Sequence, residues 1–114
     1  MNAKDLMIGD WVNLCGTPCR VKDIVNDGVI NYEKDVIPIP LTEEILKKNG
    51  FLINSNGIFY LKENLKFGFK KDFDYGYWFI NRADNYKEYI CTCDFVHELQ
   101  HILKLQQIEK EIIL

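Results

Sequence analysis

The sequence predicts an α+β fold: a mostly antiparallel β meander, one short helix and one longer C-terminal helix. Two observations carry this prediction. Short apolar runs separated by turn residues recur through most of the chain, which is typical of antiparallel strands joined by tight turns. Two segments with helix-capping residues and one apolar side interrupt and follow these runs. We expect a single domain over residues 1–114, with small-barrel-like strands in 1–40 and the remaining elements in 41–114.

The first part of the chain reads as short strands. Three are expected, at residues 10–14, 19–25 and 29–32. Gly16 lies in the turn after the first strand, and Asp27-Gly28 supplies the positive φ of a tight hairpin before the third. The opening Gly9-Asp10-Trp11-Val12 resembles the start of small, strongly bent β-barrels that serve as interaction or RNA-associated modules. That resemblance implies a shape and no particular ligand.

A short helix follows an extended segment that Pro38 and Pro40 keep out of a central sheet position. Thr42 is a good N-cap, and acidic residues follow it in the first turn, where the helix dipole favours negative charge. Gly50 suits the left-handed position just beyond a helix end. We therefore expect a helix over residues 43–49 that packs on the sheet.

The rest of the chain reads as a meander, a helix and a strand. Apolar runs between residues 51 and 92 alternate with turns rich in asparagine, glycine and aspartate. A second helix is expected over residues 94–106, with Asp94 as its N-cap. Residues 108–114 alternate between apolar and charged types, which suits a final edge strand.

Composition and charge favour a folded cytoplasmic protein. Hydrophobic residues make up 47% of the chain, and the 14 basic and 17 acidic residues are interspersed. The net charge of −3 gives no reason to expect nucleic acid or anionic lipid as a partner. No apolar run has signal-peptide length at the start or reaches the roughly 18 residues that would span a membrane. In the cytoplasm the cysteines at 15, 19, 91 and 93 are expected to be reduced, and their spacings lack the gap of a common zinc knuckle.

One five-residue stretch points toward chemistry. His97-Glu98-Leu99-Gln100-His101 matches the H-E-x-x-H pattern, in which two imidazoles one helical turn apart bind zinc and the glutamate activates water. A zinc protease also needs a third protein ligand. The carboxylates after His101 are Glu109 and Glu111, and the intervening residues contain no glycine or proline to force a chain reversal.

The helical periodicity argues against that site. Leu99 and Leu103 fall on a broad apolar side of the expected helix, whereas His97, His101 and Lys104 fall on the opposite side, which we expect to face water. We therefore predict no catalytic zinc and no cofactor. A zinc-dependent hydrolase, with Glu98 as the catalytic residue and the two histidines as metal ligands, stays open as an alternative.

A second alternative comes from two aromatic residues. Phe67 and Phe69 share one face of an expected strand, with Lys66 and Lys70 on the other face, and exposed rings of this kind stack on bases in RNA-recognition motifs. The residues flanking the rings do not fit that motif, and a meander needs one apolar face under its helix. We expect these rings in the core, with single-stranded nucleic-acid binding as the alternative.

Three segments together indicate a family. "MNAKDLMIGDWV", "PIPLTEEILKKNGF" and "VHELQHILKL" resemble, in this order, an uncharacterised family of small proteins from Bacteroides-type bacteria, often encoded near phage or mobile-element genes. The resemblance spans nearly the whole chain and implies no activity. Its members often read "VHQLQN" at the third segment, so Glu98 and His101 would depart from the family pattern.

The expected function follows from these patterns. Neither a phosphate-binding loop nor a convincing catalytic set is present, while the charge is moderate and aromatic residues are many. We predict a non-enzymatic binding or accessory domain that acts through a protein partner, and the sequence leaves its partner and oligomeric state open.

Overall fold

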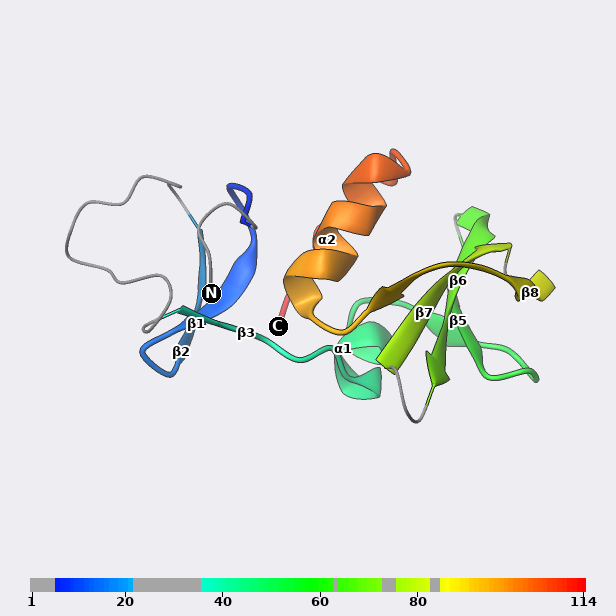
Figure 1. Cartoon of the computed structure of the whole chain (residues 1–114), viewed down its shortest axis with the longest axis horizontal. Coiled ribbons are helices and arrows are strands. Elements are labelled where there is room, and N and C mark those ends of the chain that lie inside the picture. The colour runs from blue at the N-terminus through cyan, green and yellow to red at the C-terminus, as the bar shows by residue number, and fades with distance from the viewer. Residues whose placement is uncertain (1–5, 22–35, 63, 73–75, 83–84) are drawn as a thin grey trace.

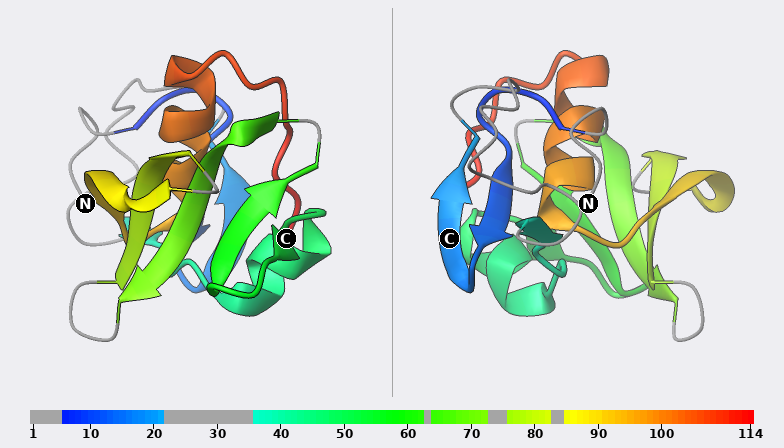
Figure 2. Two further views of the ribbon diagram at one scale, coloured as in Figure 1. Left: turned by 90° about the vertical axis from the view of Figure 1, so that its right-hand side faces the viewer. Right: turned by 60° about the vertical axis from the view of Figure 1, so that its left-hand side comes forward.

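The computed structural model of the chain describes residues 6–21, 36–62, 64–72, 76–82 and 85–114. These residues form an α+β fold with two antiparallel sheets and two helices, as the sequence predicts (Figure 1). Helix α2 (Val96–Leu105) stands between the two sheets (Figures 1 and 2). Among the described residues, no helix is long and apolar enough to cross a membrane.

The first sheet has three strands in the order β2-β1-β3, all paired antiparallel. They are β1 (Trp11–Leu14), β2 (Thr17–Arg20) and β3 (Val36–Pro38). The turn between β1 and β2 consists of Cys15 and Gly16, whose φ angles of 50° and 86° are both positive, as a two-residue type I′ hairpin requires. One face of the sheet carries a small apolar cluster of Leu6, Val12, Val21 and Val36.

The structure confirms the first expected strand as β1, while β2 begins two residues earlier than the expected second strand, and residues 22–25 of that expected strand lie outside the described residues. The expected third strand at 29–32 and the Asp27-Gly28 turn lie outside the described residues. The third strand of the described sheet is β3, and among the described residues its partner is β1. Pro38 therefore lies at an edge of the sheet as described, where its missing N–H does not interrupt the ladder with β1.

Helix α1 (Glu43–Lys48) begins as predicted, since the Thr42 hydroxyl oxygen accepts a hydrogen bond from the Ile45 N–H at 3.3 Å. Its end is also as predicted, with Gly50 at a φ of 86°. The Gly50 N–H donates to the carbonyl of Lys47 and the N–H after it donates to the carbonyl of Leu46. These two hydrogen bonds define a Schellman motif, in which glycine is the favoured residue.

The second sheet is the predicted meander, with five strands in sequential order. They are β4 (Leu52–Ile53), β5 (Ile58–Leu61), β6 (Asn64–Asp72), β7 (Gly76–Arg82) and β8 (Asn85–Cys93). The inner face carries Phe59, Phe69 and Phe79, each at most 2% exposed. These rings share one large core with apolar side chains of both helices. Apolar area removed from water here is the main stabilising contribution of this half of the molecule.

Two expectations near the end of the chain are wrong. The N-cap of α2 is Phe95 and not Asp94, so the helix begins two residues later than expected. Residues 108–114 form no strand; they run as an extended segment, which we call the strap, alongside the rest of the molecule. The alternating pattern indicated extended backbone correctly, but side chains instead of a neighbouring strand bind the strap.

Candidate functional site

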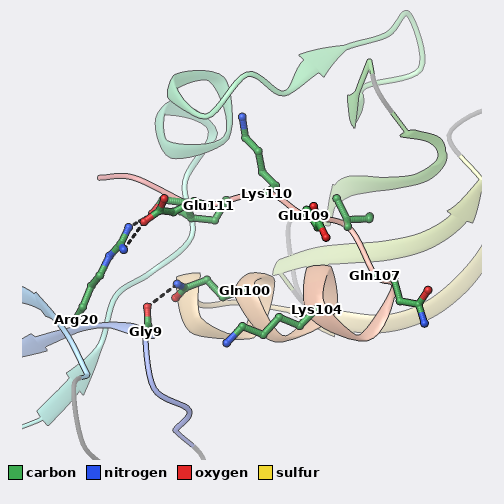
Figure 3. A pocket seen from close by; sticks show the side chains of 10 residues that line it. Gly9, Arg20, Gln100, Lys104, Gln107, Glu109, Lys110 and Glu111 are labelled. Carbon is green, nitrogen blue, oxygen red and sulfur yellow. Dashed lines mark hydrogen bonds and ion pairs between the residues drawn. The ribbon is translucent and has the colours of Figure 1, made fainter.

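A groove of about 880 Å³ lies between helix α2 and the residues that follow it (Figure 3). Its walls come from three parts of the chain. Gly9 and Arg20 belong to the N-terminal part, Gln100 and Lys104 project from α2, and residues 107–112 close the far side. The groove therefore exists only because α2 packs beside the three-stranded sheet and the chain then turns back.

The Gln100 carboxamide fixes the three-stranded sheet on α2. Its Oε1 accepts a hydrogen bond from the Trp11 N–H at 2.8 Å, and its Nε2 donates to the Gly9 carbonyl at 3.0 Å. The side chain thus pairs with the backbone at the start of β1 as a neighbouring strand would. Because both bonds are directional, they set the position of one wall of the groove relative to the other.

Three side chains bind the backbone of the strap. The Ile112 carbonyl accepts hydrogen bonds from Trp11 Nε1 at 2.7 Å and Arg20 Nη2 at 3.2 Å. The Asn49 carboxamide accepts from the Ile113 N–H and donates to the Ile113 carbonyl, both at 2.7 Å. The Ile112 side chain is 0% exposed and belongs to the large core. This surface consequently binds an extended polypeptide through backbone hydrogen bonds and one buried apolar side chain.

A sharp reversal connects α2 to the strap. The Gln107 N–H donates to the Lys104 carbonyl at 3.0 Å and the Ile108 N–H donates to the Leu103 carbonyl at 2.8 Å. This is a second Schellman motif, with Gln107 at a φ of 58° in the position that glycine usually takes. The expectation that nothing forces a reversal here is wrong, because the two hydrogen bonds stabilise a left-handed glutamine.

Charge in the groove is mixed and locally positive. Arg20 forms an ion pair with Glu111, and its guanidinium lies 4.9 Å from the centre of the Trp11 ring. The other charged side chains that line the groove are Lys104, Glu109 and Lys110. None of these three forms an ion pair within the described part of the chain. Three cations and two anions line the groove of a chain whose net charge is −3.

The two histidines of the H-E-x-x-H match do not face water, which corrects the expectation from helical periodicity. His97 is 6% exposed, and the His101 side chain is 23% exposed. His101 Nε2 lies 2.6 Å from Oδ2 of Asp10, a fully buried carboxylate that also accepts from the Met7 N–H at 2.7 Å. The reason is that the three-stranded sheet packs against the side of α2 that a lone amphipathic helix would expose.

Glu98 has a structural position. Its Oε1 accepts hydrogen bonds from the backbone N–H groups of Asp94 and Phe95 at 3.0 and 3.1 Å. Phe95 has no side-chain acceptor, so Glu98 supplies one half of a capping box and stabilises the start of α2. Glu109 and Glu111 line the groove instead of approaching the two histidines. Within the described ranges, no three His, Cys, Asp or Glu side chains are grouped so that they could hold a metal ion.

Phe67 and Phe69 lie on the core side of β6. Phe69 is 2% exposed, and its ring centre lies 5.2 Å from that of Phe79. Phe67 is half-buried and stacks on the same Phe79 ring at 5.3 Å with planes 20° apart. The core packing that the sequence favours for these rings is the arrangement the structure has.

The four cysteines are free thiols. Cys15 is exposed in its hairpin turn, whereas Cys93 is fully buried in the large core. Burial raises the pKa of the Cys93 thiol, and the nearby Glu98 carboxylate adds to that rise. Burial also raises the pKa of Cys91. Neither of these two thiols is therefore activated as a nucleophile.

Fold and groove together define a small α+β protein with a strap-closed groove, and no family model, curated protein or solved structure matches it.

The groove itself was not predicted from the sequence. Three groove residues were noted in the sequence for other reasons: Lys104 on the polar side of the expected helix, and Glu109 and Glu111 as candidate metal ligands. Gln100 was one of the two unspecified positions of the H-E-x-x-H pattern, although its carboxamide makes the bonds that build the groove wall.

Proposed function

We propose that the protein is a non-enzymatic binding domain that holds an extended, acidic segment of a partner protein in the groove between α2 and the strap. The observation that carries this proposal is the way the molecule binds its own strap. Trp11, Arg20 and Asn49 donate hydrogen bonds to carbonyls of the strap, which also buries Ile112, and Arg20 lines the groove as well. A second extended segment beside the strap would meet the same kind of chemistry.

The size and charge of the groove support this ligand class. A volume of about 880 Å³ falls within the range of roughly 300–1,000 Å³ that is typical of ligand pockets. Lys104 and Lys110 form no ion pair with a carboxylate in the described part of the chain, so acidic side chains of a partner would complement them. Gln107 adds a side-chain amide that can donate to backbone carbonyls or accept from N–H groups.

The two alternatives lack an observation of this kind. A zinc hydrolase would need Glu98 beside a metal-bound water, and that carboxylate instead accepts from the N–H groups at the start of α2. A single-stranded nucleic-acid binder would need Phe67 and Phe69 on an open face, and both belong to the packed side of β6. Partner binding in the groove would instead use Lys104 and Lys110, which take part neither in the cap of α2 nor in the core.

A peptide selection tests the proposal. Random decapeptides would be selected against the immobilised protein, and the affinity of the enriched peptides would be measured by fluorescence anisotropy for wild type and for Lys104→Glu/Lys110→Glu. Acidic peptides should be enriched and should bind the double variant at least roughly tenfold more weakly. The matched control is Lys47→Glu/Lys48→Glu, which reverses two exposed charges on α1.

Two results would contradict the proposal. One is a selection with no enrichment above a blank surface. The other is a set of peptides whose affinity falls equally in the groove variant and in the α1 control, since that would show attraction to charge anywhere on the surface. Salt dependence gives an additional check, because binding that depends on Lys104 and Lys110 weakens as ionic strength rises.

A further inference from the structure

The two helices end in the same hydrogen-bonded motif but with different residues at its left-handed position. Helix α1 has Gly50 there at a φ of 86°, and α2 has Gln107 at 58°. A side chain with a Cβ is strained in this conformation, whereas glycine is not. The molecule therefore contains both the relaxed and the strained form of one turn, and the strained form holds the strap in place.

An alternative without this strain is available to the chain. Residues 106–111 read Gln-Gln-Ile-Glu-Lys-Glu, which are good helix formers apart from one β-branched residue and include no glycine or proline. If Gln107 took helical dihedrals, α2 would extend through that residue in place of the Schellman turn, and residues 108–114 would leave the helix end without turning back. The strap would then point away from its own groove wall instead of turning back along it.

Straightening alone is unfavourable because of what it exposes. Ile112, which is 0% exposed, would enter water, and its place in the large core would be empty. The Ile112 carbonyl would lose the hydrogen bonds that it accepts from Trp11 and Arg20. Asn49 would lose its two hydrogen bonds to the backbone of Ile113. An identical strap from another molecule restores each of these contacts, since every one joins the strap to the body.

We propose that a second copy of this chain is the partner of the strap: α2 straightens at Gln107, and the strap of each molecule occupies the strap site of the other. The hinge is one strained residue, and short strained hinges favour exchange of an element between identical chains. The exchanged dimer keeps the contacts that Trp11, Arg20 and Asn49 make with the strap and the burial of Ile112, loses the two hydrogen bonds of the Schellman turn, and removes the strain at Gln107. It is independent of the peptide-binding proposal, because the strap site and the groove beside it have different occupants.

Mixed-isotope crosslinking tests the exchange. Full-length chains with a photo-crosslinking residue in place of Ile113, which is 50% exposed, would be made in light and 15N-labelled forms, mixed, unfolded and refolded at concentrations from micromolar to millimolar. Molecular mass by light scattering gives the dimer fraction. In that fraction, crosslinks between residue 113 and the peptide that contains Asn49 should join light to heavy chains, and in the monomer fraction only chains of equal mass.

Two substitutions at the hinge make the test specific. Gln107→Gly removes the strain, so the dimer fraction should fall at least about fivefold under conditions where wild type is partly dimeric. Gln107→Val increases the strain, because a β-branched residue is least tolerant of positive φ, and should raise the dimer fraction. The glycine variant is expected to fold, since Gly50 occupies the same position in the other helix.

Three outcomes would overturn the proposal. These are a monomer at every concentration, a dimer whose 113-to-49 crosslinks join only chains of equal mass, and a dimer fraction that Gln107→Gly leaves unchanged. The second outcome would show that copies associate through another surface while each strap stays in its own body. A failed peptide selection would not alter these measurements, so the two proposals are separately testable.

Discussion

The two sides of α2 are both covered, but by different means. On one side Leu99 and Leu103 pack against the phenylalanine rings of the five-stranded sheet. On the other side Gln100 and His101 meet the three-stranded sheet through hydrogen bonds to its backbone and to Asp10. A polar helix side is therefore no guarantee of exposure, because a few well-placed hydrogen bonds can attach a second layer to it.

Apolar packing and hydrogen bonding on the two sides of α2 contribute to the molecule in different ways. Apolar packing is non-directional and scales with the area removed from water, so it contributes most of the stability. Hydrogen bonds contribute little net free energy each, but they tolerate only a narrow range of distance and angle. We infer that the apolar side of α2 keeps the molecule folded, and that the polar side fixes the geometry of the groove. Four substitutions or conditions test this division.

The largest effect is expected for Phe69→Ala on the apolar side. Loss of a fully buried ring that contacts Phe51 and Phe79 should lower the free energy of unfolding by about 3–5 kcal/mol in urea titrations. Phe67→Ala should cost less, because that ring is only half-buried. Equal costs for the two variants, or a cost below 1 kcal/mol for Phe69→Ala, would contradict the assignment of the main core.

A smaller effect is expected for Asp10→Ala on the polar side. The variant removes the acceptor of both the Met7 N–H and His101, which should cost about 2–3 kcal/mol. The cost is moderated because His101 is partly exposed and water can replace its partner. The same urea titrations measure it. Asp94→Ala, which removes an exposed carboxylate, is the control and should be nearly neutral.

Gln100→Ala should cost less again, about 1–2 kcal/mol, because two neutral hydrogen bonds to the backbone before β1 are lost. Its larger consequence should be local. Hydrogen exchange at the Trp11 amide should accelerate, while amides of β6 and β7 keep their protection. Gln106→Ala in the C-cap of the same helix is the matched control. Uniform acceleration across both sheets would show that the division between the two sides is wrong.

The smallest effect concerns Tyr77 and pH. Burial raises the pKa of Tyr77 to about 12, with a further contribution from Glu43. Above pH 10 the unfolded chain releases this proton while the folded chain retains it, so stability falls as pH rises from about 10 toward 12. At pH 10.5 the loss should be roughly 0.8 kcal/mol relative to pH 8.

The Tyr77→Phe variant isolates this contribution from that of other groups that titrate in the same range. Thermal melts of both proteins would be measured between pH 8 and pH 11. We expect the melting temperature of wild type to fall more steeply with pH than that of the variant, because the folded chain holds the Tyr77 hydroxyl protonated. Equal pH dependence in the two proteins would show that Tyr77 has an ordinary pKa. The variant should be at least as stable as wild type at pH 8, because the buried hydroxyl has no hydrogen-bond partner among the described residues.

Local patterns in the sequence were sufficient for much of the fold. The hydroxyl of Thr42 and the missing side chain of Gly50 act within one turn of α1, so both ends of that helix could be predicted. Alternating apolar runs with turn residues likewise predicted the meander. Each of these features depends on neighbours along the chain.

The groove depends on partners distant in sequence. Periodicity in α2 could not show that Asp10 and Trp11 lie against its polar side. The spacing of residues along one helix carries no information about a sheet that packs on that helix from elsewhere in the chain. Gln107 gave no signal either, because non-glycine residues rarely adopt positive φ. Alternation in residues 108–114 is the same for an edge strand and for a strap bound by side chains, so only the structure distinguishes the two.

The hydrogen bonds between Asn49 and the strap also make strap binding sensitive to deamidation of Asn49. Asparagine followed by glycine is the sequence most prone to deamidation, and Asn49 precedes Gly50. Its Nδ2 donates to the carbonyls of Ile45 and Ile113, and a carboxylate formed there would turn an oxygen toward both. Deamidation of Asn49 would therefore release the strap, whereas deamidation of Asn56 in the exposed turn before Gly57 would not. Peptide mapping of stored protein, with the strap followed by hydrogen exchange, would distinguish the two sites.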